Sequence, residues 1–150
     1  LPICPSSYEL LYRSGAGLTP RPLRRIASGG ELSRVMLASK VVLGNADGVD
    51  TLVFDEVDAG VGGSTARALA GVLADLAATH QVIVVTHLAQ VAVMADKHYV
   101  VSKEPGDVPQ THLDEVTGEA RTAEIARMLS GDQSEASLAH ARQMLEEARG

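Results

Sequence analysis

Short apolar runs and apolar stripes at helical spacing alternate along this chain. Two runs, residues 51–55 and 82–86, have no polar alternation and predict buried strands. Apolar residues three and four positions apart predict helices, and alternating patterns bounded by turn residues predict further strands. The expected helices cover about 30–45, 64–80, 88–95, 120–129 and 134–148, and the further strands about 8–14, 98–102 and 110–116. This order predicts an α/β fold whose sheet is mostly parallel at its centre.

Polar residues follow the two apolar strands and precede the first long helix. Ser28 and Glu31 have the Ser-x-x-Glu spacing of a helix capping box, and Gly29 and Gly30 lie between them. Free N–H groups and a positive dipole end make such a helix start suitable for a phosphate. A plain capped helix explains the same residues equally well.

Asp55 and Glu56 end the first apolar run, and Thr86 and His87 end the second. In open α/β sheets, ligands bind beyond the carboxyl ends of the strands. The residue types therefore predict a phosphate and a metal ion at this edge. A polar strand end and an ordinary partly buried histidine are the alternatives for these residues.

Three stretches together resemble the ABC-type ATPases. Residues 28–31 look like the signature motif, residues 52–56 like a Walker B strand, and His87 like the switch histidine. Within that superfamily the chain is similar to the RecN family of bacterial DNA-repair ATPases, which are SMC-like. The similar stretches are ASGGELSR from 27, FDEVDAGVGG from 54, THLAQVA from 86 and EIARMLSG from 124. The resemblance spans nearly the whole chain and implies one domain, 1–150, forming the C-terminal lobe of an ABC-type P-loop NTPase head, with helices flanking a mostly parallel central sheet.

The resemblance also implies a role for each matched acid and for the histidine. Asp55 would hold Mg²⁺, a hard cation that suits carboxylate and phosphate oxygens. Glu56 would orient or deprotonate the water that attacks ATP. His87 would hydrogen-bond the γ-phosphate.

The signature motif implies a dimer of heads. Ser28, Gly29, Gly30 and Glu31 would contact the phosphates of ATP bound to a second, identical head. Asp58 and the turn at 59–62 would lie at the seam between the heads. Two positions depart from the superfamily pattern: Gly62 stands where an aspartate is common, and Ala27 replaces the usual leucine.

No Walker A motif occurs in the chain. The stretch 60–65 is rich in glycine but lacks a lysine and the G-x-x-x-x-G-K-[ST] spacing. The resemblance places Walker A in an N-terminal half of the same head, separated by a long coiled coil. Because the chain begins at Leu1 rather than Met, we expect it to be part of a longer protein.

Composition limits the partners and the compartment. The formal net charge of −6 argues against a wholly basic nucleic-acid surface, although Arg21, Arg24 and Arg25 could contact an acidic partner. With three Tyr, one Phe and no Trp, a base-stacking platform is not expected. A single cysteine fits a reducing cytosol, and no apolar run reaches the ~20 residues of a membrane span. We expect a cytoplasmic, nucleoid-associated protein that reaches DNA through its full length.

The favoured hypothesis is an ATP-binding and ATP-hydrolysing head that acts in DNA double-strand break repair and recombination. The head of another SMC- or Rad50-type ATPase is a close alternative. An ABC transporter ATPase subunit comes from another functional class, and a coiled coil upstream would exclude it. A degenerate module that binds a partner without hydrolysing ATP is the last alternative, and it is disfavoured by the presence of Asp55, Glu56 and His87.

Overall fold

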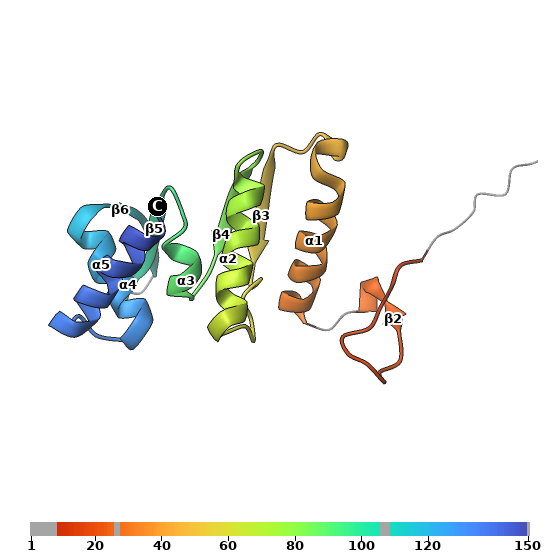
Figure 1. The fold of residues 1–150 in the computed structure, drawn as a ribbon, viewed down its shortest axis with the longest axis horizontal. Helices are drawn as coiled ribbons and strands as arrows, with labels where there is room; N and C mark the ends of the chain where they lie inside the picture. The colour runs from red at the N-terminus through yellow and green to blue at the C-terminus, as the bar shows by residue number, and fades with distance from the viewer. Residues whose placement is uncertain (1–8, 26–27, 106–108, 150) are drawn as a thin grey trace, which may run out of the picture.

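The computed structural model describes residues 9–25, 28–105 and 109–149, and Figure 1 shows how their helices and strands follow one another. The order alternates strands and helices, as the sequence pattern predicts. The elements are β1 (Leu11–Tyr12), β2 (Arg21–Pro22), η1 (Leu23–Arg25), α1 (Gly29–Leu43), η2 (Gly44–Asp47), β3 (Thr51–Asp55), α2 (Gly63–Ala77), β4 (Gln81–Val85), α3 (Ala89–Ala92), β5 (His98–Glu104), β6 (Gln110–Val116), α4 (Gly118–Ser130) and α5 (Glu135–Glu147).

The centre of the molecule is a parallel strand pair, β3 and β4, joined by α2. The register runs from Thr51 opposite Gln81 to Asp55 opposite Val85, so both carboxyl ends lie at one edge. Leu52 and Phe54 of β3 point into the main core, which α1, α2 and α3 complete. The buried members of this core are Leu37, Leu52, Phe54, Val57, Leu69, Ala70, Leu73, Leu76 and Val91. The expected α/β fold with a parallel centre is confirmed.

The opposite face of this strand pair is uncovered in the chain. Val53 is 65% exposed, Ile83 46% and Val85 58%. The prediction that both strands are buried is therefore wrong for this face of the described chain. Alternate side chains of a strand point to opposite faces, and the main core takes up Leu52 and Phe54 but not Val53.

Helix α1 begins and ends with the chemistry that its sequence predicts. Ser28 is the N-cap, and its Oγ accepts a hydrogen bond from the Glu31 backbone N–H at 3.4 Å. Gly44 ends the helix with a φ of 55°, a backbone conformation that favours glycine. A short 3₁₀ turn, η2, follows it. The helix expected over about 30–45 is confirmed to within its ends.

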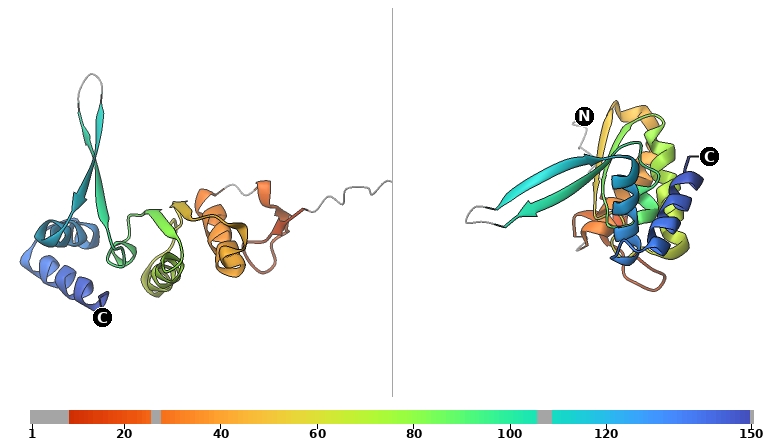
Figure 2. Two further views of the ribbon diagram at one scale, coloured as in Figure 1. Left: turned by 90° about the horizontal axis from the view of Figure 1, so that it is seen from above. Right: turned by 90° about the vertical axis from the view of Figure 1, so that its left-hand side faces the viewer.

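The C-terminal part forms a second core beside α3. Helices α4 and α5 pack on each other and on α3 through Ala89, Ala92, Val93, Ile125, Ala126, Ala141 and Leu145. The antiparallel hairpin of β5 and β6 pairs His98 with Val116 and Glu104 with Gln110, and it projects from the body as a long ribbon (Figure 2). The predicted hairpin and both C-terminal helices are confirmed.

The N-terminal part is less regular than the sequence predicts. The strand expected over about 8–14 is reduced to Leu11–Tyr12, which pairs with Arg21–Pro22. Tyr8, Cys4 and Ala27 lie outside the described residues. Among the described residues, no helix has the length and apolar character needed to cross a bilayer.

Candidate functional site

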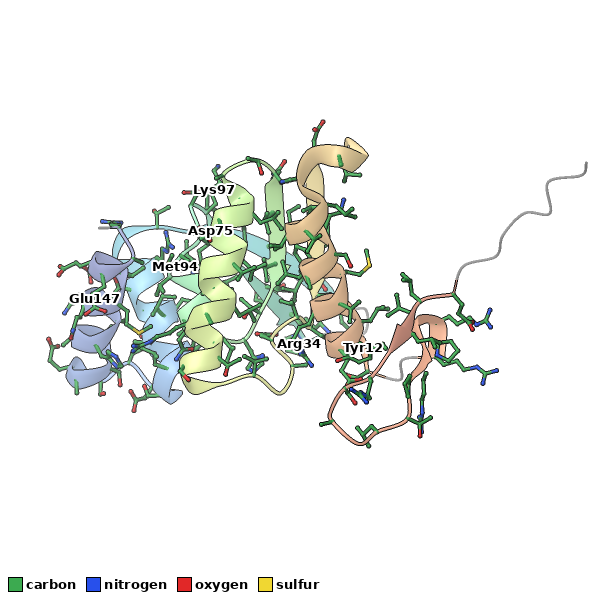
Figure 3. The ribbon with its side chains drawn as sticks, turned by 45° about the vertical axis from the view of Figure 1, so that its right-hand side comes forward. Tyr12, Arg34, Asp75, Met94, Lys97 and Glu147 are labelled. Carbon is green, nitrogen blue, oxygen red and sulfur yellow. The ribbon has the colours of Figure 1, made fainter. Side chains whose placement is uncertain are left out.

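The start of α1 is fastened to the end of β3 by side-chain hydrogen bonds to backbone oxygens. Ser33 Oγ donates to the Asp55 carbonyl at 2.6 Å. Arg34, which Figure 3 labels beside the loop that leads from β3 to α2, donates from Nη1 to the carbonyls of Val57 at 3.2 Å and Ala59 at 2.8 Å. A guanidinium carries several N–H donors in a rigid fork, which suits it to hold two carbonyls of one turn. The helix start and the turn at 56–59 therefore form one unit.

The two glycines of this helix start are in close approach to the same turn. A Cβ on Gly30 would lie 2.7 Å from Ala59 Cβ and 2.8 Å from the Glu56 carbonyl oxygen. A Cβ on Gly29 would lie 2.7 Å from Oε2 of the Glu56 side chain. Both glycines thus have a packing reason within their own chain, beside any contact with a phosphate.

Glu56 stands at the bend between β3 and the turn. Its φ of 54° makes it the one non-glycine residue with a positive φ among the described residues. Such a backbone costs about 1–3 kcal/mol and persists where the surroundings hold it. The Glu56 carbonyl accepts the Ala59 N–H at 3.0 Å, which closes the turn. The exposed Glu56 carboxylate lies against Gly29 at the positive end of α1, where a negative charge is favoured.

Asp58 lies inside this turn and joins it to the end of β4. The residue is 2% exposed. Its Oδ2 accepts hydrogen bonds from Thr86 Oγ1 at 2.5 Å and from the His87 backbone N–H at 3.1 Å, and it lies 3.1 Å from His87 Nδ1. Asp58 therefore has partners within its own chain, which the sequence expectation of a residue at a dimer seam did not include.

The His87 side chain is 71% exposed, and Asp55 and Glu56 are exposed as well. The structure thus brings Ser28, Gly29, Gly30 and His87 to one edge of the β3–β4 pair, together with Asp55 at the end of β3 and Glu56 after it. This convergence was expected from the strand ends. The chemical roles of these residues remain predictions.

A magnesium ion at this edge would need ligands besides the side chains of the described residues. The described residues contain no group of three or more His, Cys, Asp or Glu side chains arranged to hold a metal ion. Asp55 is an exposed carboxylate at the end of β3, and Mg²⁺ is commonly bound by one or two carboxylates together with waters and substrate phosphates. The donor set therefore fits a metal held jointly with a nucleotide.

Sequence reasoning assigned no role to Ser33 or Arg34 and gave Thr86 only a place at a strand end, although each of the three holds the site together. Ser33 and Arg34 lie three and four positions after Gly30, so they share the helix face on which that glycine approaches the turn. Thr86 donates to Asp58 and accepts the Leu88 N–H at 3.0 Å, so it ties the loop after β4 in both directions. Its contact with a residue 28 positions away has no signal in the sequence.

No model of a protein family matches the chain. Curated proteins do match it over most of its length. The chain is 53% identical over 139 residues to the DNA repair protein RecN of Treponema pallidum, which covers 91% of the chain and 24% of that protein. It is 54% identical over 141 residues to RecN of Deinococcus radiodurans. The alignment covers 93% of the chain and 25% of that protein. It is 52% identical over 146 residues to RecN of Mycobacterium tuberculosis H37Rv. The alignment covers 94% of the chain and 24% of that protein.

The chain therefore spans about a quarter of the length of these relatives. Among solved structures, a chain described under "ATP-driven dimerization and DNA stimulated activation of SMC ATPases" aligns with 90% of this chain and 69% of its own length. The sequence identity is 21% and the TM-score 0.49, a likeness too slight to bear on function.

Proposed function

We propose that this chain, which is homologous over nine-tenths of its length to a segment of the RecN DNA repair proteins, is the C-terminal lobe of an ABC-type ATPase head. In this proposal the full-length protein binds and hydrolyses ATP and acts in DNA double-strand break repair and recombination. ATP lies between two heads, and the signature motif of one head contacts the nucleotide of the other. The protein works in the cytoplasm, at the nucleoid.

The observation that carries the proposal is the meeting of three elements at one sheet edge. The glycine-rich start of α1 packs on the turn that holds Glu56, and Asp58 of the same turn bonds the loop that presents His87. A helix start suits a phosphate, and the acids suit a metal ion and an attacking water, which are parts that phosphoryl transfer uses.

Each exposed group has one proposed task. Asp55 holds Mg²⁺ together with the nucleotide, and the bound ion would neutralise charge on the phosphates. Glu56 orients the attacking water and accepts its proton. His87 hydrogen-bonds the γ-phosphate. Ser28, Gly29, Gly30 and Glu31 supply the helix start that faces the phosphates of the second head's nucleotide.

The uncovered face of the β3–β4 pair supports a further part of the proposal. Val53, Ile83 and Val85 form an apolar strip that a folded protein would bury. We assign the missing cover to the N-terminal half of the same head, which also supplies the Walker A lysine and phosphate cradle that this chain lacks. The other partners are a second, identical head and DNA, the latter through the rest of the protein.

The experiment that tests the proposal is Glu56→Gln in the full-length protein. The amide keeps the shape of the side chain and removes the base, so ATP binding should persist while the hydrolysis rate falls by about two orders of magnitude or more. Glu119→Gln is the control because Glu119 is an exposed carboxylate on α4, and its turnover should equal that of the wild type. Full turnover in Glu56→Gln would refute the assignment.

A further inference from the structure

One oxygen of the buried Asp58 carboxylate, Oδ2, accepts two hydrogen bonds. Its Oδ2 accepts from the Thr86 hydroxyl and the His87 backbone N–H, and it faces the His87 ring at Nδ1. A buried carboxylate is costly unless hydrogen bonds compensate it. Both hydrogen bonds that Oδ2 accepts come from the loop that follows β4, 28 and 29 residues further along the chain.

These contacts determine how the imidazole is presented. Oδ2 lies 3.1 Å from Nδ1, and a carboxylate has no proton to donate, so this contact favours the ring form that carries a proton on Nδ1 over the form with a lone pair there. Oδ2 of Asp58 also accepts the His87 backbone N–H. One oxygen therefore contacts both the loop and the His87 ring. The ring remains 71% exposed, and Nε2 is the nitrogen left to face a ligand.

We propose that Asp58 is a positioning residue that holds His87 with Nδ1 protonated and Nε2 directed to the reacting phosphate. This inference rests on the proposed function for its ligand, whereas the contact itself does not. A ring that also donates from Nε2 to a phosphate oxygen carries two protons and a positive charge, which the buried carboxylate balances. Asp58 thereby acts through His87 and does not touch the nucleotide.

Glu56 and Asp58 lie in the same turn but face opposite directions. Glu56 faces outward at the bend, and Asp58, two residues later, faces inward to the loop. The Ala59 N–H on the Glu56 carbonyl closes the turn, and Arg34 donates to the Ala59 carbonyl. The predicted base and the predicted phosphate sensor are therefore held by one turn.

The first test is the protonation of the His87 ring in the nucleotide-free, full-length protein labelled with ¹⁵N in histidine side chains. His87→Gln identifies the signals of this ring by their loss. We expect the proton on Nδ1 in the wild type and a mixture of tautomers, or a shift of the proton to Nε2, in Asp58→Asn. A wild-type ring protonated on Nε2 alone would overturn the inference, whether or not any variant folds.

The second test is a double-mutant cycle on the rate of ATP hydrolysis. Asp58→Asn should lower kcat by about 10- to 100-fold, the range for partners that orient a histidine, and leave the Kd for ATP within about twofold. In a His87→Ala background the same change should alter kcat less than about twofold, because the group it positions is absent. Equal losses in both backgrounds would assign Asp58 a purely structural role and overturn the inference.

The outcomes separate this inference from the proposed function. A full-length wild-type protein without ATP hydrolysis would refute the proposed function, while the ¹⁵N spectrum of the His87 ring would still decide whether Asp58 positions that ring.

Thr86→Val is the matched variant. It removes one donor to Oδ2 and leaves the His87 ring contact in place, so the Nδ1 proton should remain. Loss of that proton in Thr86→Val to the same extent as in Asp58→Asn would also count against Asp58 as the group that positions the ring.

Discussion

The close approach at Gly30 predicts a clear difference between Gly30→Ala and Gly29→Ala. A methyl group on Gly30 would meet the Glu56 carbonyl at 2.8 Å and Ala59 Cβ at 2.7 Å, both of which are fixed to the turn. Forcing an extra carbon into a packed site costs about 1–3 kcal/mol, and the better helix propensity of alanine returns at most about 1 kcal/mol. With about 1 kcal/mol returned, the net loss should reach up to about 2 kcal/mol, a factor of up to about 30 in the local opening equilibrium.

Gly29→Ala should behave differently because the contact it creates is with Oε2, the far end of the Glu56 side chain, which can rotate away. Its stability should change little, while ATP hydrolysis should fall because the carboxylate is displaced. Gly71→Ala in α2 is the matched control for helix propensity: nothing lies within 4 Å of its Cβ, so it should stabilise by about 0.4–1 kcal/mol.

The assay is hydrogen exchange of peptides covering α1, β3 and the following turn in the full-length protein, measured for all three variants. Faster exchange in Gly30→Ala alone supports the reasoning. If Gly30→Ala exchanges as slowly as Gly71→Ala, the close approach of α1 and the turn does not exist in solution.

Three other predictions follow from the site and from the corner between α4 and α5. Ser28→Arg heads and Glu56→Gln heads should each be inactive, and their mixture should recover some ATPase activity if the signature motif acts across a dimer; a flat rate at every mixing ratio, with mixed dimers present, counts against that arrangement. Residues 1–150 alone should show no micromolar ATP binding in calorimetry, because the Lys and N–H cradle of Walker A are absent. Hydrogen bonds from Ser137, Ser134 and Ser130 lower the pKa of Asp132 to about 2 from 3.8, so the stabilisation they give is complete above pH 3.8 and is lost as the pH falls through about 2. Hydrogen exchange of the corner between α4 and α5 should therefore depend on pH in this range in the wild type and not in Asp132→Asn. The same pH profile in both proteins would contradict the prediction.

Local physical chemistry determined most elements of this protein. The Ser28 cap, the Gly44 end of α1 and the apolar run of β3 need only neighbouring residues, and each matches its prediction closely. The register of a parallel pair then brings Asp55 and Val85 level, which is why residues after both strands meet at one edge. To this extent the candidate site was predictable from strand ends and a helix cap.

Only the tertiary structure decided how that edge is held together. Gly30 is small because a turn 26 to 29 residues away approaches it, and Asp58 is buried because its partners are Thr86 and His87. The exposed faces of β3 and β4 were likewise not visible in the apolar pattern, because a run of Val and Ile does not tell which side other elements cover. Local propensity and periodicity, which the sequence alone contains, determined which groups follow each strand. The contacts that orient those groups join residues far apart in the chain, and the fold alone brings such residues into reach.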